Sequence, residues 1–257
     1  MKNKLEGKSF IITGASKGLG EVIAKSFSKY NMKLALIARD KKELKRVKKL
    51  CNKTSKCKIF PIDLLEIENI ENKLKKVIQY LGDVDGIIHV AGGGYGFRDP
   101  LLDANRFSKL INLNLLSIVE INRILLPSMI KNKKGNIVHV GSVAGTDAIG
   151  SVAYNTSKAA LNAYVRSLGN EMAKYNVIAA GILPGAFLAP NNAMKRLQDN
   201  NPDAYNQFIS HRLPRKKMGE ALELLPIIKI LSTNDASMLG GSMISIDAGE
   251  GKSYERI

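Results

Sequence analysis

The sequence predicts an α/β protein with one parallel sheet of about seven strands and helices on both of its faces. Short apolar runs rich in β-branched residues alternate along the chain with longer amphipathic segments, which is the pattern of strands joined by crossover helices. A chain of 257 residues with 45% hydrophobic content can also bury one large core. No internal repeat or low-complexity stretch divides it, so we expect a single domain over residues 1–257.

Seven segments have the length and composition of buried strands. They are Ser9–Thr13, Lys33–Ala38, Lys56–Ile62, Val84–Val90, Asn136–Val140, Val177–Leu183 and Ser242–Ile246. The segments between them carry apolar residues at helical spacing. The predicted helices are Gly18–Tyr30, Lys41–Leu50, Ile67–Leu81, Asp103–Lys131, Val152–Lys174 and Gly219–Ser232, with Ala189–Arg212 helical in part. The least regular stretch, residues 184–217, is the predicted mobile substrate lid.

The formal net charge of +16 is compatible with a nucleic acid, an anionic membrane surface or an anionic small ligand as partner. Lysines are concentrated between Lys41 and Lys58 and between Lys73 and Lys76, where they alternate with apolar residues at helical spacing. This pattern is typical of solvated helix faces. We therefore expect the charge to serve solubility, and we expect no nucleic-acid partner.

Targeting and redox features favour a cytoplasmic protein. The longest apolar candidate for a membrane span, Val177–Pro190, is interrupted by glycine and proline, and the charged start Met1–Lys8 leaves no room for a signal peptide. Cys51 and Cys57 are the only cysteines, too few for a disulfide scaffold. We expect no membrane partner and no metal site.

A glycine-rich turn follows the first strand and opens the first helix, with the spacing T-G-x-x-x-G-x-G over Thr13–Gly20. Glycines permit a tight turn in which amides at a helix N-terminus face the pyrophosphate of a dinucleotide. Many strand-to-helix turns need glycine for backbone reasons alone, so this turn is weak evidence by itself. The expected cofactor contacts here are Gly14, Ser16, Lys17, Gly18, Leu19 and Gly20.

This spacing and the landmarks after it resemble the short-chain dehydrogenase/reductase family, including its 3-oxoacyl-carrier-protein reductase-like members. The resemblance implies a Rossmann-type, doubly wound parallel sheet that binds a nicotinamide dinucleotide. It places Asp63 against the adenine ring, with Leu64 beside it. It also places Ala91 and Gly92 next to the cofactor.

The pair His89-Val90 stands where the family has two asparagines. Any bracing that those asparagines give to neighbouring strands must therefore come from other residues in this chain. We expect His89 to be a packed strand residue and not a catalyst.

The end of the second strand predicts NADP(H) in preference to NAD(H). An acidic residue at the strand tip would bind the ribose hydroxyls and repel a 2′-phosphate, whereas Arg39 offers a planar fork suited to phosphate oxygens. Lys17 adds a second cation, and family members with basic residues at these two positions prefer NADP. Asp40 keeps an acidic group one residue away, and both cations are open to the alternative that they are surface charges.

The pattern Tyr154-x-x-x-Lys158 places a phenol and an ammonium one helical turn apart. A phenol with a pKa of about 10 is a poor proton shuttle at neutral pH, but a fixed cation beside it favours the phenolate. This spacing also occurs by chance in many helices. The resemblance adds that Lys158 holds the nicotinamide ribose, so that both residues are catalytic and contact the cofactor.

Other landmarks of the family recur around this pair. Ser142 precedes Tyr154 by twelve residues and is expected to bond the substrate oxygen. Asn114, in preference to Asn112, matches the asparagine that holds a water in the proton relay. Pro184 and Gly185 match the turn that borders the nicotinamide amide, although the threonine often found beyond it is absent, with Ala189 near its place.

Together these residues predict hydride transfer between NADP(H) and a carbonyl or secondary alcohol, with Tyr154 as the general acid or base. The alternative is a catalytically silent dinucleotide-binding regulatory protein. The substrate is open: a cluster of basic groups near the lid suggests an anionic one, either a 3-oxoacyl thioester or a phosphorylated or nucleotide-linked sugar. That cluster is Arg98, His211, Arg212, Arg215, Lys216 and Lys217.

The long helical segments Asp103–Lys131 and Val152–Lys174 carry more apolar positions than one sheet face can cover. In the resembled family these helices form a two-fold interface. We therefore expect a homodimer or homotetramer.

Overall fold

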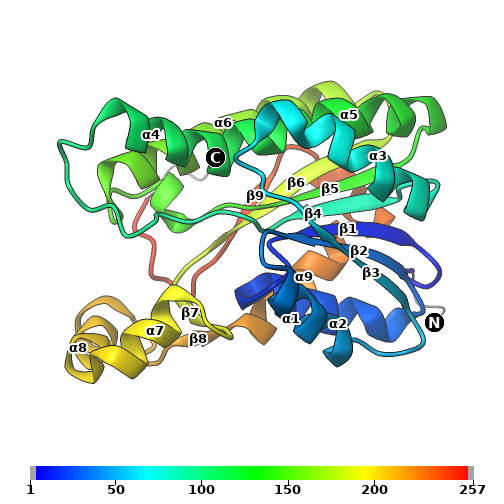
Figure 1. Ribbon diagram of the computed structural model, residues 1–257. Coiled ribbons are helices and arrows are strands. Elements are labelled where there is room, and N and C mark those ends of the chain that lie inside the picture. The colour runs from blue at the N-terminus through cyan, green and yellow to red at the C-terminus, as the bar shows by residue number, and fades with distance from the viewer. Residues whose placement is uncertain (1–3, 254–257) are drawn as a thin grey trace.

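The computed structural model of the chain describes residues 4–253 and has one parallel seven-stranded sheet (Figure 1). Its strand order is β3-β2-β1-β4-β5-β6-β9. The strands are β1 Ser9–Thr13, β2 Lys33–Ala38, β3 Lys56–Pro61, β4 Gly86–His89, β5 Gly135–Val140, β6 Val177–Pro184 and β9 Met243–Ile246. All seven predicted strands are confirmed, and the largest difference in their limits is at β4, which is shorter at both ends than the predicted Val84–Val90.

Helices cover both faces of this sheet, so the prediction of a doubly wound Rossmann-type fold is confirmed. They are α1 Gly18–Phe27, α2 Lys41–Leu50, α3 Ile70–Leu81, α4 Ala104–Ile111, α5 Ser117–Asn132, α6 Val152–Ala173 and α9 Ala221–Leu231. Short 3-10 turns lie at Ser28–Tyr30, Ile67–Asn69, Val143–Gly145 and Asn234–Leu239. In Figure 1, α1, α2 and α9 lie below the sheet and α3 to α6 lie above it.

The predicted helix Asp103–Lys131 is interrupted by one π-helical turn, Asn112–Leu116, that joins α4 to α5. The predicted helix Gly219–Ser232 begins two residues late, because Gly219 and Glu220 form a short strand instead. A π-helical turn of five residues and a two-residue strand are each too short to stand out in a sequence period.

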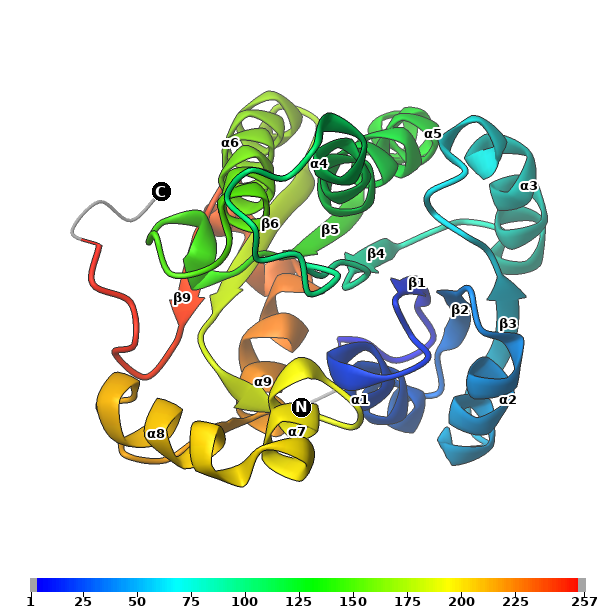
Figure 2. The ribbon, with the colours of Figure 1, turned by 60° about the vertical axis from the view of Figure 1, so that its left-hand side comes forward.

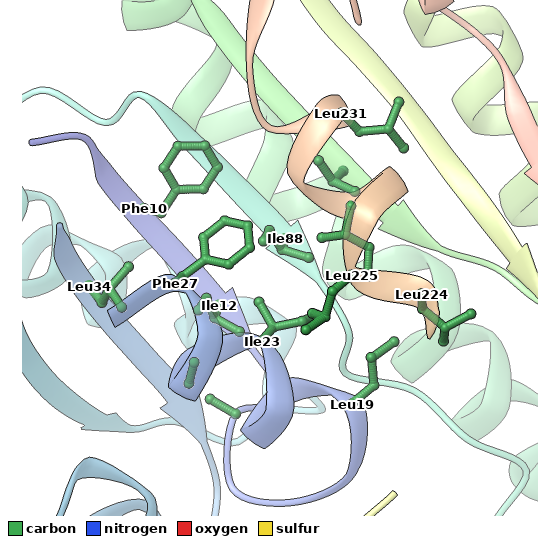
Figure 3. Packing of buried hydrophobic residues seen from close by; sticks show 14 of the residues in the cluster. Phe10, Ile12, Leu19, Ile23, Phe27, Leu34, Ile88, Leu224, Leu225 and Leu231 are labelled. Atoms are coloured by element: carbon green, nitrogen blue, oxygen red, sulfur yellow. The ribbon is translucent and has the colours of Figure 1, made fainter. Parts of the chain in front are cut away.

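The core beneath the sheet holds α1 and α9 against β1 and its neighbours (Figure 3). Phe10 of β1 meets Phe27 of α1 edge to face, with ring centroids 6.0 Å apart. Leu225 of α9 is buried in the same cluster. Each buried side chain of this size contributes roughly 1.5–3 kcal/mol, so these contacts hold α1 firmly against β1.

The predicted lid, residues 184–217, contains two helices, α7 Ala193–Asn200 and α8 Pro202–Arg212. The two-residue strand β7, Phe187–Leu188, pairs with β8, Gly219–Glu220. Figure 2 shows α7 and α8 at the lower edge of the molecule, past the end of β6. A small separate cluster around Tyr205 packs these elements together. The segment thus forms a layer of its own after β6.

The helical run Ala104–Lys131 has the length and mean hydropathy of a segment able to cross a membrane. The expectation of no such segment is therefore wrong by length and composition, because it considered only uninterrupted apolar stretches. A core helix of a soluble protein passes the same test. Here α5 packs against the sheet through Ile121, Leu125 and Met129, while Leu116 stays 42% exposed.

The lysine-rich segments lie where the periodicity predicts them. In α2 the buried residues are Leu44 and Val47, and in α3 they are the apolar positions of one face. The lysines of both helices are exposed or half-buried. Most of the charge in these two helices therefore lies on solvated faces, as predicted.

Candidate active site

The order in which successive strands are added to the sheet reverses between β1 and β4. These two strands are neighbours although they are far apart in the sequence. In doubly wound sheets, ligands bind outside the carboxyl ends of the strands at this point. The hydroxyl of Thr13, at the end of β1, accepts hydrogen bonds from the amides of Val90 and Ala91, at 3.0 and 3.1 Å. This side chain therefore provides bracing between the two strands that the missing asparagines do not.

The turn after β1 needs glycine because the backbone after β4 approaches it closely. Gly14 has a φ of +64°, and a Cβ there would lie 2.8 Å from the amide nitrogen of Ala91. The amide of Gly18 donates to the carbonyl of Pro190, 2.7 Å away, so the segment after β7 closes over the turn. The amide of Gly18, which was expected to face the cofactor phosphates, is therefore already bonded to a backbone carbonyl.

An ion pair that the sequence did not reveal supports this turn from the side. Glu21, in the first turn of α1, is buried and accepts a 2.7 Å hydrogen bond from Arg46 of α2. Arg46 also donates to the carbonyl of Ser16. The partners are 25 residues apart in the sequence and no motif links them. Lys17 itself is exposed, and Leu19 and Gly20 are buried.

The ends of β2 and β3 carry one exposed arginine, which pairs with Asp63, and two carboxylates that accept backbone hydrogen bonds. The side chain of Arg39 is 60% exposed and lies 4.0 Å from Asp63. Asp40 caps α2 by accepting hydrogen bonds from two backbone amides, and Asp63 accepts one from the amide of Leu65. Leu64 is buried. Because Asp40 is committed to the cap, Arg39 is left as the charge available to a ligand.

Asn114 lies in the π-helical turn and is fully buried. Its Oδ1 accepts a hydrogen bond from the amide of Gly93, and its Nδ2 donates to the carbonyls of Gly93 and Leu110. Both donors of this amide are therefore used, and the side chain fixes the backbone after β4. A Cβ at Gly92 would lie 2.7 Å from Asn114 Oδ1 and 3.5 Å from Lys158 Nζ, so only glycine fits between them.

Tyr154 and Lys158 lie one turn apart at the start of α6, with Lys158 Nζ 5.9 Å from the centroid of the phenol ring. Lys158 is 4% exposed, and its ammonium donates to the carbonyl of Val140 at the end of β5. An ammonium has three donors, so two remain for a ligand among the described residues. Burial lowers the pKa of Lys158 to about 8.

Burial raises the pKa of Tyr154, and hydrogen bonding with the Ser142 hydroxyl opposes the rise. Burial, the largest cause, thus acts against the lowering of the Tyr154 pKa that a neighbouring cation favours. Ser142 also accepts a hydrogen bond from the amide of Ala144, which fixes the turn after β5. Tyr154 is therefore a protonated phenol at neutral pH, as a general acid must be.

Residues 8–200 match the family model described as short chain dehydrogenase. The chain belongs to this family. It is 37% identical over 183 residues to Dehydrogenase/reductase SDR family member 7 of Mus musculus, covering 68% of this chain and 54% of that protein. The chain thus spans about half the length of that curated relative. Over 252 residues it is 28% identical to Oxidoreductase UcpA of Escherichia coli strain K12, covering 96% of this chain and 95% of that one.

Solved structures agree with the family assignment. Levodione reductase superposes with a TM-score of 0.88 at 26% identity, covering 97% of this chain and 99% of that one. Two others, below 25% identity, support the fold alone. One is a 7 alpha-hydroxysteroid dehydrogenase complexed with NADH (TM-score 0.87, 24%, covering 96% of each chain), and one is ElxO with NADP bound (0.86, 23%, covering 95% and 98%). Members of the family are oxidoreductases that act on small molecules with a nicotinamide cofactor and typically form oligomers.

The arrangement of this chain fits such a cofactor. Gly14 and Gly92 lie where a Cβ would clash with neighbouring atoms, and Lys158 retains unused donors beside Gly92. Gly185, after β6, is also crowded, because a Cβ there would lie 2.7 Å from Glu250 Oε2. Pro184 ends β6 at the same edge of the sheet. Among residues 4–253, no group of three or more metal-ligating side chains is present.

Glu250, which follows β9, was not identified from the sequence. Its carboxylate connects the segment after β9 to the lid. It is 7% exposed, accepts a 2.6 Å hydrogen bond from the amide of Ala186 and pairs with Arg212 of α8 at 2.8 Å. Glu250 therefore fixes both the turn beside Gly185 and the second lid helix.

The basic cluster expected to attract an anionic substrate is largely engaged with protein groups. Arg212 pairs with Glu250, and Arg215 pairs with Glu223 of α9 at 2.9 Å. Lys216 donates to the carbonyl of Ser210. These contacts reduce the positive charge that is free to face a substrate at the lid.

His89 is 1% exposed, as expected for a packed strand residue. Its Nε2 lies 2.8 Å from Oδ1 of Asn122 on α5, and its ring stacks on that of His139. Asn122 also donates to the hydroxyl of Tyr164 on α6. This buried network connects β4 and β5 to the helices above them.

Proposed function

We propose that this protein is an NADP(H)-dependent oxidoreductase that interconverts a carbonyl and a secondary alcohol, with Tyr154 as the general acid or base. The observation that carries the proposal is the group formed by the half-buried Ser142 and Tyr154 and the buried Lys158, beside Gly92. A bound nicotinamide supplies or accepts the hydride. Every other requirement of the reaction falls to the protein's own side chains.

Those side chains support reduction near neutral pH. Because burial raises the pKa of Tyr154, its hydroxyl retains the proton that a nascent alkoxide needs. Ser142 is close enough to hydrogen-bond the same phenol, and it would hold the substrate oxygen. Lys158, with a pKa of about 8, is mostly charged at pH 7 and would bind ribose hydroxyls with its free donors.

The preference for NADP(H) rests on Arg39 and, secondarily, Lys17, and not on the structural relatives, which include two complexes with NAD(H) and one with NADP. Arg39 is exposed and Asp40 is engaged in a helix cap, which leaves the end of β2 cationic. A guanidinium binds phosphate oxygens in a bidentate manner, whereas a bare ribose gains little from it.

The substrate is a small carbonyl compound or alcohol, and the anionic candidates from the sequence stay predictions. Arg212 and Arg215 each form an ion pair with a glutamate, which weakens the case for an anionic substrate. Arg98 forms no ion pair within residues 4–253. A turnover screen with NADPH should therefore compare 3-oxoacyl thioesters and keto-sugar phosphates with neutral ketones. Binding of NADPH without turnover of any compound would favour the regulatory alternative.

The experiment that tests the mechanism is Tyr154→Phe, assayed with the best substrate of that screen. Only the transferable proton is removed, so NADPH binding should be unchanged and turnover should fall by about 100-fold or more. Tyr205→Phe, in the lid cluster, is the matched control and should retain turnover. Near-wild-type activity of Tyr154→Phe would refute the assigned mechanism.

We further propose a symmetric dimer through α4–α5 and α6, where apolar side chains such as Leu116 and Val152 remain 42% and 54% exposed. Sedimentation across micromolar concentrations tests the assembly, and a stable monomer would contradict it.

The two free thiols, Cys51 and Cys57, are compatible with the reducing cytoplasm.

A further inference from the structure

The loop that follows β4 places an aromatic residue in an unusual backbone conformation. Tyr95 has a φ of +53°, a region that bulky residues rarely adopt, and it lies between glycines. The preceding Gly94 packs against the ring of Tyr154, because a Cβ there would lie 3.6 Å from Tyr154 Cδ2. The first part of this loop therefore lies beside Tyr154.

Helix α4 and the loop itself hold the Tyr95 ring in place. Its ring stacks on Phe97 with centroids 5.7 Å apart, and the ammonium of Lys109 lies 4.9 Å from its centroid. These contacts fix the direction of the side chain without using its polar end. A strained backbone that is held this firmly indicates that the position of the side chain matters.

The hydroxyl of Tyr95 is buried and donates no hydrogen bond to a protein acceptor within residues 4–253, although it lies near enough to Arg39 for hydrogen bonding with that side chain to lower the pKa of the phenol. The charged groups that act on it are Arg39 and Asp63, at the ends of β2 and β3. Burial raises the pKa of this phenol, so it remains a donor at neutral pH. A buried hydroxyl without a partner is costly, and a ligand or water that completes it relieves that cost.

We propose that Tyr95 is a second determinant of cofactor choice, whose hydroxyl donates a hydrogen bond to the 2′-phosphate of NADP(H) beside Arg39. This inference rests on the proposed preference for NADP(H). Arg39 supplies the charge, and Tyr95, in the loop that also contacts Tyr154, supplies a directed donor next to it. A hydroxyl bonds more strongly to an anion than to a neutral ribose hydroxyl, so Tyr95 favours the phosphorylated cofactor.

The test uses adenosine fragments, because they isolate the 2′-phosphate from hydride transfer and from the substrate. Binding of 2′,5′-ADP and of 5′-AMP is measured by titration calorimetry, since the chain has no tryptophan to report binding by fluorescence. In Tyr95→Phe, 2′,5′-ADP should bind about tenfold more weakly, as expected for one lost hydrogen bond to a charged group, while 5′-AMP changes less than about twofold.

Tyr80→Phe is the matched control, because it also removes a phenol hydroxyl but one that bonds to the carbonyl of Lys56. It should leave the affinity for both fragments unchanged. If the wild type prefers 2′,5′-ADP and Tyr95→Phe keeps that preference, the role of Tyr95 is overturned while the NADP assignment stands. Equal changes for both fragments also overturn it, because the residue would then only shape the entrance. A wild type without any preference overturns the NADP assignment and this inference together.

Discussion

The two ends of the candidate site are built in different ways. At the reaction end, Asn114 and Lys158 are almost fully buried, and their polar groups bond to backbone atoms after β4 and β5. At the adenosine end, Arg39 is 60% exposed and meets Asp63 only at 4.0 Å. The chemistry is thus preorganised by packing, whereas the choice of cofactor depends on a few solvated charges and one buried hydroxyl. Single substitutions should therefore seldom change the reaction class, whereas they should readily change the cofactor preference.

The sharpest test of the reaction end is the charge of Lys158. Its ammonium is lost as pH rises through about 8, and the pKa of Tyr154 is raised, so the phenol stays protonated in that range. The value of kcat/KM for NADPH in reduction should be level near pH 7 and fall above pH 8. Lys158→Met should lower it by about 100-fold or more at pH 7 and remove the decline near pH 8. Lys174→Met, on the exposed end of α6, should keep the wild-type profile. A decline near pH 8 that persists in Lys158→Met would assign it to another group.

The lowered pKa values of two buried histidines, His89 and His139, predict how the free energy of unfolding depends on pH. Burial lowers the pKa of His89 to about 4, against about 6.5 when unfolded. The pKa of His139 is lowered in the same direction, by burial first and then by the charges of His89 and Lys158. The unfolded chain therefore binds more protons between these values, so the free energy of unfolding falls as pH drops from about 6.5 toward 4.

His89→Asn, which restores the family's residue, removes one of these two titrations. The groups that contact it, Asn122 and the stacked ring of His139, stay in place. Between pH 7.5 and 4.5 the wild type should lose about 2.5 kcal/mol more unfolding free energy than the variant, measured by urea denaturation. His211→Asn, on the exposed surface of α8, should not change the slope. Parallel pH curves for wild type and His89→Asn would show that His89 is not held neutral in the fold.

The same contrast between buried and exposed groups explains what the sequence could predict. The seven strands follow from apolar runs, and Ser142, Tyr154 and Lys158 were identified from their spacing together with the resemblance to the family. The pairs Glu21–Arg46 and Glu250–Arg212 are separated by 25 and 38 residues and form only through tertiary packing. The strands β7 and β8 have two residues each, too few to show a period.

The electrostatic prediction for Tyr154 shows a second limit. It was based on the charge of Lys158, but the effect of burial on the phenol is larger, and burial depends on the whole fold. The role of Tyr95 was not predicted either, because a positive φ and an unpartnered hydroxyl exist only in three dimensions. Sequence patterns therefore propose which residues react, while packing sets their pKa values.

The smallest expected effect concerns the exposed adenosine end. Arg39→Ala should weaken NADPH binding by about tenfold and NADH binding by less than about twofold, because only NADPH carries the phosphate that the guanidinium can grip. The effect should shrink at high salt, since the side chain is 60% exposed and its charge is screened. Arg106→Ala removes an equally exposed arginine of α4, paired with Asp103, and controls for a loss of net charge. If Arg39→Ala weakened both cofactors alike, the end of β2 would not be the site of discrimination, and the contrast between the two ends would have to rest on the Tyr95 hydroxyl alone.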